Sequence, residues 1–256
     1  MNKKNVVKNS LGYDSDLYIY QDKTMFNYSV DTILLGNFVS LNRKTKKILE
    51  IGTNNGALAI FVAERHKEIQ IDAIEIQKKA IVLAKKNVEL NKKEAQINLI
   101  QEDFNVFYKK HMKNQWKKYD TIICNPPFYK VANNMKRTSV SEELLIATHE
   151  IKLTLEQIIE GSSKIIQQKG YLAFVLPTER FVDCIFLLRK YNFEPKRVKM
   201  VFPRENEKSH LVLIEARFAS GWGTSFETNI YLHPQDKNVH IYRDEVKKLY
   251  KPIKIK

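Results

Sequence analysis

The chain has 256 residues, of which 43% are apolar, which is enough for one large globular domain with its own core. No stretch approaches the roughly 20 apolar residues of a membrane span, and no apolar signal core follows the basic amino terminus, so we expect a cytoplasmic protein without a membrane segment. The formal charge of +14 favours a polyanionic partner such as nucleic acid. A lysine-rich composition of the kind that an AT-rich genome produces would give the same charge without any role in binding.

Hydrophobic patterns along the chain predict an alternation of strands and helices. The first 30 residues are polar and poorly periodic. Helices are predicted over 30–39, 56–66, 77–91, 142 to about 168 and 179–191, and strands over 47–51, 69–74, 97–100, 119–124, 170–176, 196–202 and 210–218. Such alternation indicates right-handed βαβ units and therefore a parallel sheet.

The last two predicted strands are separated only by a polar turn at 204–209, which favours an antiparallel hairpin. We therefore expect an α/β fold with a mostly parallel seven-stranded sheet, helices on both faces and an antiparallel carboxyl-terminal hairpin. The chain is expected to divide into an amino-terminal arm or cap (1–30), a main domain (31–218) and a basic carboxyl-terminal extension packed on the same domain (219–256).

A glycine-containing turn follows the first predicted strand. Glu50 is followed by glycines two and six residues on, at Gly52 and Gly56. The glycines let the backbone turn tightly and approach a ligand, and the acid can bind a cationic or hydroxyl-bearing group. Any tight turn from a strand into a helix could produce this pattern, so the turn alone is a weak signal.

Two further acids strengthen the interpretation of the turn. Glu75 closes the second strand, about 20 residues after the turn, where a ribose diol is usually held, and Asp103 follows the third. The turn lacks the regular G-x-G-x-x-G of a pyrophosphate site and presents an acid, so a cationic nucleoside such as S-adenosylmethionine fits better. The predicted cofactor-binding residues are Glu50, Gly52, Thr53, Asn54, Gly56, Glu75, Ile76, Asp103, Phe104 and Asn125.

The most informative segment is Asn125-Pro126-Pro127-Phe128, at the carboxyl end of the strand predicted over 119–124. Ligands of open α/β sheets bind at this edge. The two prolines fix φ near about −65° and remove two backbone donors. An amide, free carbonyls and an aromatic ring in one rigid loop can hold a planar amino group. The alternative is a turn that is merely stiffened by proline.

The cysteines and histidines predict no metal site. Cys124 and Cys184 both lie in apolar runs and are expected to be buried, small apolar residues rather than a disulfide or a ligand pair. The six histidines show no metal-ligand spacing.

Together these residues resemble the class I, Rossmann-like, S-adenosylmethionine-dependent methyltransferases. The segment 125–128 looks like the (N/D)PP(Y/F) motif of the subset that methylates exocyclic or amide nitrogens. Within that subset the chain is similar to the bacterial tRNA1(Val) adenine-37 N6-methyltransferase family, over roughly residues 10 to 250. The segments that carry this narrower likeness are 26–35, 129–131, 147–150 and 242–250.

The resemblance implies that 31–218 is a methyltransferase domain that methylates the 6-amino group of adenine in tRNA. Asn125, Pro126, Pro127 and Phe128 would form the catalytic segment: the Asn125 side-chain oxygen and the Pro126 carbonyl would accept the two amino hydrogens, and Phe128 would stack on the base. The protein is expected to act as a monomer with tRNA as its partner. Candidate contacts to RNA phosphates are Lys3, Lys4, Lys130, Lys136, Arg137 and Arg180.

Two positions depart from the family pattern. Asn54 stands where glycine is usual in the cofactor turn, and Thr148 stands where arginine is usual. Asn tolerates left-handed backbone better than most residues, so we expect the turn to be kept; whether Asn54 weakens cofactor binding is left open by the sequence. The alternatives are the same chemistry on rRNA guanine, DNA adenine or protein glutamine, and an RNA-binding protein that has lost its cofactor.

Overall fold

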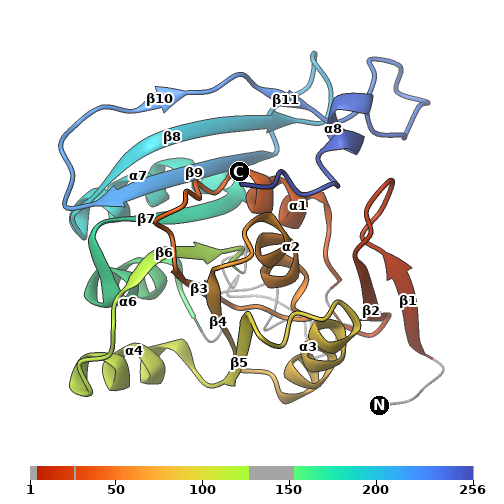
Figure 1. The fold of residues 1–256 in the computed structure, drawn as a ribbon. Helices are drawn as coiled ribbons and strands as arrows, with labels where there is room; N and C mark the ends of the chain where they lie inside the picture. Colours follow the sequence, from red (N-terminus) through yellow and green to blue (C-terminus); the bar gives the residue numbers. More distant parts are fainter. Residues whose placement is uncertain (1–4, 26, 127–152, 256) are drawn as a thin grey trace, which may run out of the picture.

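The computed structural model describes residues 5–25, 27–126 and 153–255. Its main feature is a nine-stranded sheet of order β10-β8-β9-β7-β6-β3-β4-β5, with β11 also paired to β8 (Figure 1). The strands are β3 (Lys47–Ile51), β4 (Gln70–Glu75), β5 (Ile97–Gln101), β6 (Tyr119–Cys124), β7 (Ile166–Pro177), β8 (Phe193–Phe202), β9 (Leu211–Phe218), β10 (Ser225–Phe226) and β11 (Ile230–Tyr231).

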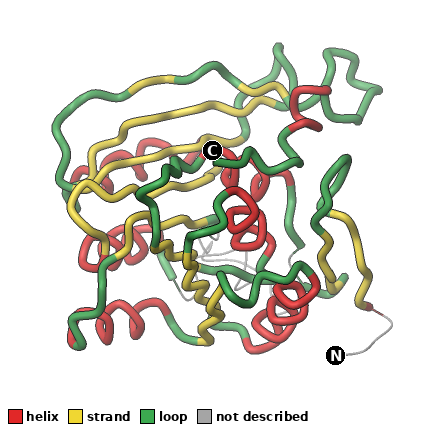
Figure 2. The backbone as a smooth tube through the Cα atoms, in the orientation of Figure 1, coloured by secondary structure: helices red, strands yellow, loops and turns green. Residues whose placement is uncertain are grey.

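The helices alternate with these strands along the chain (Figure 2). They are α1 (Val30–Phe38), α2 (Ala57–Arg65), α3 (Lys78–Leu90), α4 (Phe104–Lys113), α6 (Leu155–Ile165), the 3-10 turn η2 (Thr178–Arg180), α7 (Phe181–Lys190) and α8 (Asp244–Lys248). In the described ranges, no helix is long and apolar enough to cross a membrane.

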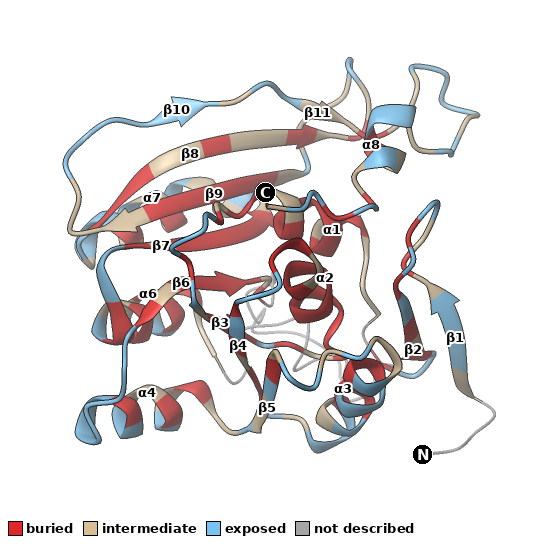
Figure 3. Cartoon of the chain, viewed as in Figure 1, coloured by how far each residue is buried: buried red, intermediate tan, exposed pale blue. Residues whose placement is uncertain are grey.

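Successive residues of a strand point to opposite faces of the sheet, and this alternation builds two cores. Ile48 and Ile123 pack with α1 and α2 on one face. Their neighbours Leu49 and Ile122 pack with α4 and α6 on the other face. Figure 3 shows the buried residues in the central strands and on the helix surfaces turned toward them. The predicted α/β sheet with helices on both faces is therefore confirmed.

The sheet is parallel from β5 through β4, β3 and β6 to β7. Strand β9 is antiparallel to both β7 and β8, as the predicted carboxyl-terminal hairpin requires. The seven predicted strands are all present. The two-residue strands β10 and β11, which the sequence did not predict, add to the outer edge of β8.

One helix prediction needs correction, and one helix was missed. The helix predicted from 142 to about 168 is too long in its described part. Residues 153 and 154 precede α6, and residues 166–168 belong to β7. Residues 142–152 lie outside the described residues. Helix α6 starts at a capping box, in which Gln157 N donates to Thr154 Oγ1 at 3.2 Å and Thr154 N donates to Gln157 Oε1 at 2.9 Å.

Helix α4 was not predicted at all. Asp103 caps it by accepting a hydrogen bond from Asn105 N at 2.7 Å. Its buried residues Phe104, Phe107 and His111 follow a helical period, so the signal was present but short.

The amino-terminal segment contains a further element that the sequence did not predict. Strands β1 (Val6–Ser10) and β2 (Tyr18–Asp22) form an antiparallel hairpin, which lies beside α3 (Figure 1). At the other end of the chain, Val246 and Tyr250 are buried in the core cluster that contains α1. The division into segments at residues 30 and 218 stays a prediction.

Candidate active site

A cavity lies at the carboxyl ends of the parallel strands, where β3 has β4 on one side and β6 on the other. Helix α2, which follows β3, packs on one face of the sheet, and α6, the next described helix after β6, packs on the other face, so the helices diverge from this edge. Such a divergence is the usual place for a ligand in an open α/β sheet. Residues that end β3, β4 and β6 line the cavity, including Ile51, Glu75 and Cys124.

The turn after β3 has a left-handed backbone at three positions. The φ angles are 74° at Gly52, 49° at Asn54 and 83° at Gly56. Gly52 N and Thr53 N both donate to Ile74 O at 2.9 Å, which ties the turn to the end of β4. Asn54 therefore adopts the conformation that glycine would give, and the predicted retention of the turn is confirmed.

Glu50 is the most deeply buried acid of the cavity, with 2% of its surface exposed. Thr53 Oγ1 donates to Glu50 Oε2 at 2.7 Å. Burial raises the pKa of Glu50 from its ordinary value of 4.5 to about 7; the hydrogen bond from Thr53 lowers the pKa, and the charge of Glu75 raises it slightly. A cation in the cavity would favour the ionised form.

Glu75 receives two backbone hydrogen bonds. Asn54 N donates to its Oε2 at 3.0 Å and Gln77 N donates to its Oε1 at 2.9 Å. Burial raises the pKa of Glu75, and these backbone N–H groups act against that rise. The carboxylate therefore holds the two loops in place while it lines the cavity beside Ile76.

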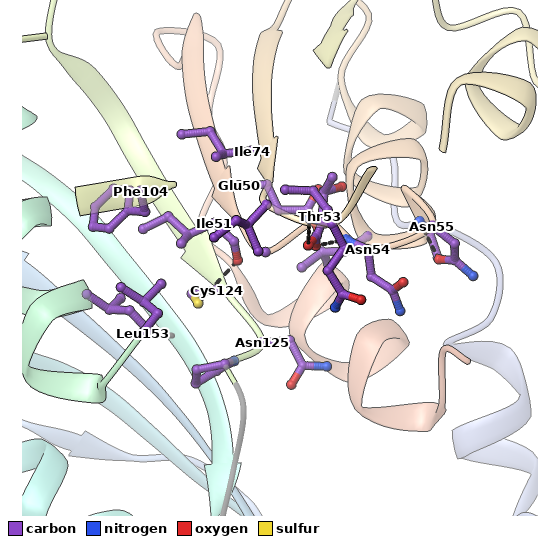
Figure 4. Close-up of a pocket in the computed structure, with 18 of the residues that line it drawn as sticks. Glu50, Ile51, Thr53, Asn54, Asn55, Ile74, Phe104, Cys124, Asn125 and Leu153 are labelled. Atoms are coloured by element: carbon purple, nitrogen blue, oxygen red, sulfur yellow. Dashed lines mark hydrogen bonds between the residues drawn. The ribbon is translucent and has the colours of Figure 1, made fainter. Parts of the chain in front are cut away.

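Asn125 and Pro126 line the cavity from the end of β6. Figure 4 shows Asn125 next to Cys124, at the end of β6. Its Oδ1 is buried and has no hydrogen-bond partner among the described atoms. An unpaired buried oxygen costs about 1–3 kcal/mol, so a ligand that donates a hydrogen bond would stabilise it.

Cys124 lies directly before this amide and has a structural role. Its Sγ donates to Ile51 O at 3.3 Å, which links the ends of β6 and β3 (Figure 4). Burial raises its pKa well above the ordinary value, so the thiol stays protonated. Cys184 is buried as well, and both cysteines are free, as predicted.

The structure brings nearly all predicted cofactor residues into this one cavity. Glu50, Gly52, Thr53, Asn54, Glu75, Ile76, Asp103, Phe104 and Asn125 line it. The exception is Gly56, which starts α2 within the same turn. The contacts of these residues with a ligand stay predictions.

The predicted catalytic and RNA-binding residues are only partly within the described ranges. Pro127, Phe128, Lys3, Lys4, Lys130, Lys136 and Arg137 lie outside the described residues. Arg180 ends the 3-10 turn after β7, and its Nε lies 3.4 Å from Asp183 Oδ2. Its contact with RNA stays a prediction.

Several lining residues were not predicted: Tyr28, Thr32, Asn55, Gln77 and Leu153. Tyr28 reaches the cavity from the segment before α1, and its hydroxyl donates to Leu11 O at 2.9 Å. No local pattern marks Tyr28, because its position depends on the hairpin. Gln77 could have been found, since it follows Glu75 by two residues in the same loop.

Within the described residues, no group of three or more His, Cys, Asp or Glu side chains could hold a metal ion. The polar side chains of the cavity are instead carboxylates, amides and hydroxyls.

Comparisons with known proteins agree with this arrangement. The family described as "Methyltransferase small domain" matches residues 29–152. The tRNA1(Val) (adenine(37)-N6)-methyltransferase of Flavobacterium psychrophilum is 29% identical over 197 residues, covering 76% of this chain and 81% of the relative. The enzyme of that name from Christiangramia forsetii is 27% identical over 238 residues, covering 93% and 95%.

A predicted O-methyltransferase from Agrobacterium tumefaciens superimposes with a TM-score of 0.68, covering 88% of this chain and 98% of that structure, at 19% identity. That likeness concerns the fold. The fold and the cavity define a class I methyltransferase whose cofactor is S-adenosylmethionine. Among these enzymes, the chain is similar to the tRNA1(Val) (adenine(37)-N6)-methyltransferases, which confirms the resemblance inferred from its motifs.

The residues of the cavity fit this cofactor. It carries a cationic sulfonium and a ribose diol, and the cavity offers the buried acids Glu50 and Glu75 together with the left-handed turn between β3 and α2.

Proposed function

We propose that this protein transfers a methyl group from S-adenosylmethionine to the 6-amino group of an adenine in tRNA, at adenine 37 of tRNA1(Val). The observation that carries the proposal is the unpaired, buried Oδ1 of Asn125 in the same cavity as the acids of the cofactor turn. The names of the relatives and the charge of +14 support the choice of acceptor.

The acceptor nitrogen needs help because its lone pair is conjugated into the adenine ring. Asn125 Oδ1 would accept one amino hydrogen, and the Pro126 carbonyl would accept the other. Holding both hydrogens favours a pyramidal nitrogen whose lone pair is free to attack. The extra proton becomes acidic after methylation and leaves to water, so no strong base is required beforehand.

On the other side of the cavity, side chains would bind the cofactor and orient it. When bound, S-adenosylmethionine supplies an electrophilic methyl on a sulfonium. Glu75 would accept hydrogen bonds from ribose hydroxyls, and Glu50 would favour a cationic group nearby. Aligning two reactants at about 3–3.5 Å can lower a barrier by several kcal/mol.

The adenine must leave the stack of its loop to enter the cavity, which costs less in a loop than in a duplex. Phe128 would stack on the extruded base, a contact worth about 1–3 kcal/mol. Lys3, Lys4, Lys130, Lys136, Arg137 and Arg180 would contact phosphates. The enzyme would act as a monomer in the cytoplasm.

The direct test is incubation of the protein with labelled S-adenosylmethionine and unmodified tRNA. We expect label in tRNA adenine. Absence of label from tRNA under conditions where calorimetry detects cofactor binding would contradict the proposal.

A substrate panel tests the acceptor separately. Ribosomal RNA, adenine-containing DNA and a glutamine-containing protein should take up little label compared with tRNA. A preference for any of these would keep the chemistry and overturn the assigned substrate.

A further inference from the structure

The amino-terminal hairpin is attached to α3 by two asparagines. Asn87 accepts from Tyr20 N at 2.6 Å and donates to Tyr20 O at 3.0 Å. Asn91 accepts from Tyr18 N at 3.1 Å and donates to Tyr18 O at 2.6 Å. Each amide thus pairs with one residue of β2 as a neighbouring strand would.

Helix and strand geometry explain why the two pairs fit together. Asn87 and Asn91 are four residues apart on one helix face, an advance of about 6 Å. Tyr18 and Tyr20 are two residues apart on a strand, an advance of about 6.6 Å. Since β1 pairs with the other edge of β2, both edges of this short strand are satisfied.

Asn87 makes one contact that Asn91 lacks. Its Nδ2 also donates to Asn55 O at 2.9 Å, and Asn55 belongs to the cofactor turn. Asn87 is fully buried, and the hydrogen bonds of its side chain go to the hairpin and this turn. Asn91 Nδ2 makes its second bond to Asn87 O within α3, at 2.7 Å.

The cofactor turn depends on such fixed points. Residue 54 has a φ of 49°, a conformation that asparagine tolerates but does not prefer. On one side of the turn, Asn54 N is fixed by Glu75. On the other side, the Asn55 carbonyl is fixed by Asn87, and Gly56 lies against Ala84 of α3, where an added Cβ would be in van der Waals contact with the Ala84 Cβ at 3.4 Å.

We propose that Asn87 is a positioning residue for cofactor binding, which holds the cofactor turn in register with the amino-terminal hairpin. Asn87 does not line the cavity and acts through Asn55. The inference rests on the proposed use of this turn for S-adenosylmethionine, but it does not depend on which acceptor is methylated.

The test compares Asn87→Ala with Asn91→Ala, because both variants release the hairpin and only the first releases the turn. Titration calorimetry with S-adenosylmethionine alone measures the Kd. Loss of one buried hydrogen bond predicts a Kd about three- to tenfold higher for Asn87→Ala and changed by less than about twofold for Asn91→Ala. Hydrogen exchange at the Tyr18 and Tyr20 amides should rise in both variants, which verifies that the hairpin is loosened.

A second variant, Asn87→Asp, keeps the acceptor for Tyr20 N and removes the N–H donors to Tyr20 O and Asn55 O. It should weaken cofactor binding as well, and a cooperative thermal transition identifies the variants that fold. In turnover, KM for the cofactor should rise while kcat at saturating cofactor stays near the wild-type value. A merely structural role would lower stability without this split.

Two results would overturn the proposal. Either Asn87→Ala and Asn87→Asp bind the cofactor as tightly as the wild type, or Asn91→Ala weakens binding as much as Asn87→Ala does. The second result would mean that hairpin docking, rather than the bond to Asn55, sets the turn. Because no RNA is present, failure of the tRNA assay cannot produce either result.

Discussion

The acids on the cofactor side of the cavity and the Asn125 amide on the acceptor side differ in how their oxygens are satisfied. On the cofactor side, Glu50 is bonded by Thr53, and Glu75 is bonded by the backbone of Asn54 and Gln77. On the acceptor side, Asn125 Oδ1 is buried without a partner in the described structure. The protein thus holds the two carboxylates with its own hydrogen bonds, whereas the Asn125 oxygen, like Asn55 Nδ2 and Gln77 Oε1 beside the cofactor turn, has no partner in the described structure and is open to a ligand.

This difference predicts that substitutions on the two sides of the cavity change different quantities. Changes on the cofactor side should affect affinity for S-adenosylmethionine first, and changes at Asn125 should affect transfer first. The predictions below run from the largest expected effect to the smallest.

Asn125→Ala removes the free acceptor. We expect kcat for methyl transfer to fall by about 10²- to 10³-fold, the usual cost of one preorganised polar group in a transition state. The Kd for S-adenosylmethionine should change by less than about threefold. Asn98→Ala, which removes an exposed amide on β5, is the matched control and should retain activity. Equal activity of Asn125→Ala and the wild type would refute the role of Asn125.

Glu75→Ala removes a charged acceptor that also fixes the cofactor turn. We expect the Kd for S-adenosylmethionine to rise about 10- to 100-fold, because hydrogen bonds to charged groups contribute about 1.5–3 kcal/mol. Calorimetry measures this change, and Glu68→Ala, at a surface glutamate after α2, should leave Kd unaltered. An unchanged Kd for Glu75→Ala would mean that the turn binds no ligand.

The raised pKa of Glu50 predicts that the stability of the folded protein depends on pH. Its pKa in the folded protein, about 7, exceeds its ordinary value of 4.5, so the folded state binds more protons than the unfolded state between these values. The contribution of Glu50 to stability is therefore lost as pH rises from about 4.5 to 7. Without cofactor, Glu50→Gln should be more stable than the wild type at pH 8 by about 3 kcal/mol, and the difference should shrink at pH 5.

Urea unfolding at the two pH values measures this difference. A gap between variant and wild type that is the same at pH 5 and pH 8 would show that Glu50 titrates normally.

The smallest effects concern the turn backbone. Gly52 has a φ of 74° with open space around an added Cβ, so Gly52→Ala introduces backbone strain alone and should cost about 1 kcal/mol in thermal unfolding. Asn54→Gly should change stability by less than about 0.5 kcal/mol, since asparagine already tolerates its φ of 49°. A large gain in cofactor affinity for Asn54→Gly would instead identify Asn54 as a functional defect.

Local sequence patterns were sufficient for the central sheet. Strands β3 and β6 match their predicted ranges because each is a short apolar run between polar segments. The sequence also predicted that Glu50, Glu75 and Asp103 lie at the same edge of the sheet, because the carboxyl ends of neighbouring parallel strands meet there.

The elements that were not predicted are those whose hydrogen-bond partners lie far away in the sequence. The residues of β1 are mostly exposed, and β2 gains its second set of hydrogen bonds from Asn87 and Asn91, about 70 residues away in the chain. The position of Tyr28 in the cavity also depends on a partner outside its own segment, because its hydroxyl donates to Leu11 O, between β1 and β2. A pattern read over a short window contains none of these partners.

The most direct test of the account is nucleoside mapping by mass spectrometry of unmodified tRNA1(Val) after incubation with the protein and S-adenosylmethionine, alongside a transcript with guanine at position 37. The account predicts one methyl group on N6 of adenine 37 and none in the guanine transcript. Methylation at another nucleotide, or none while the cofactor binds, would contradict it.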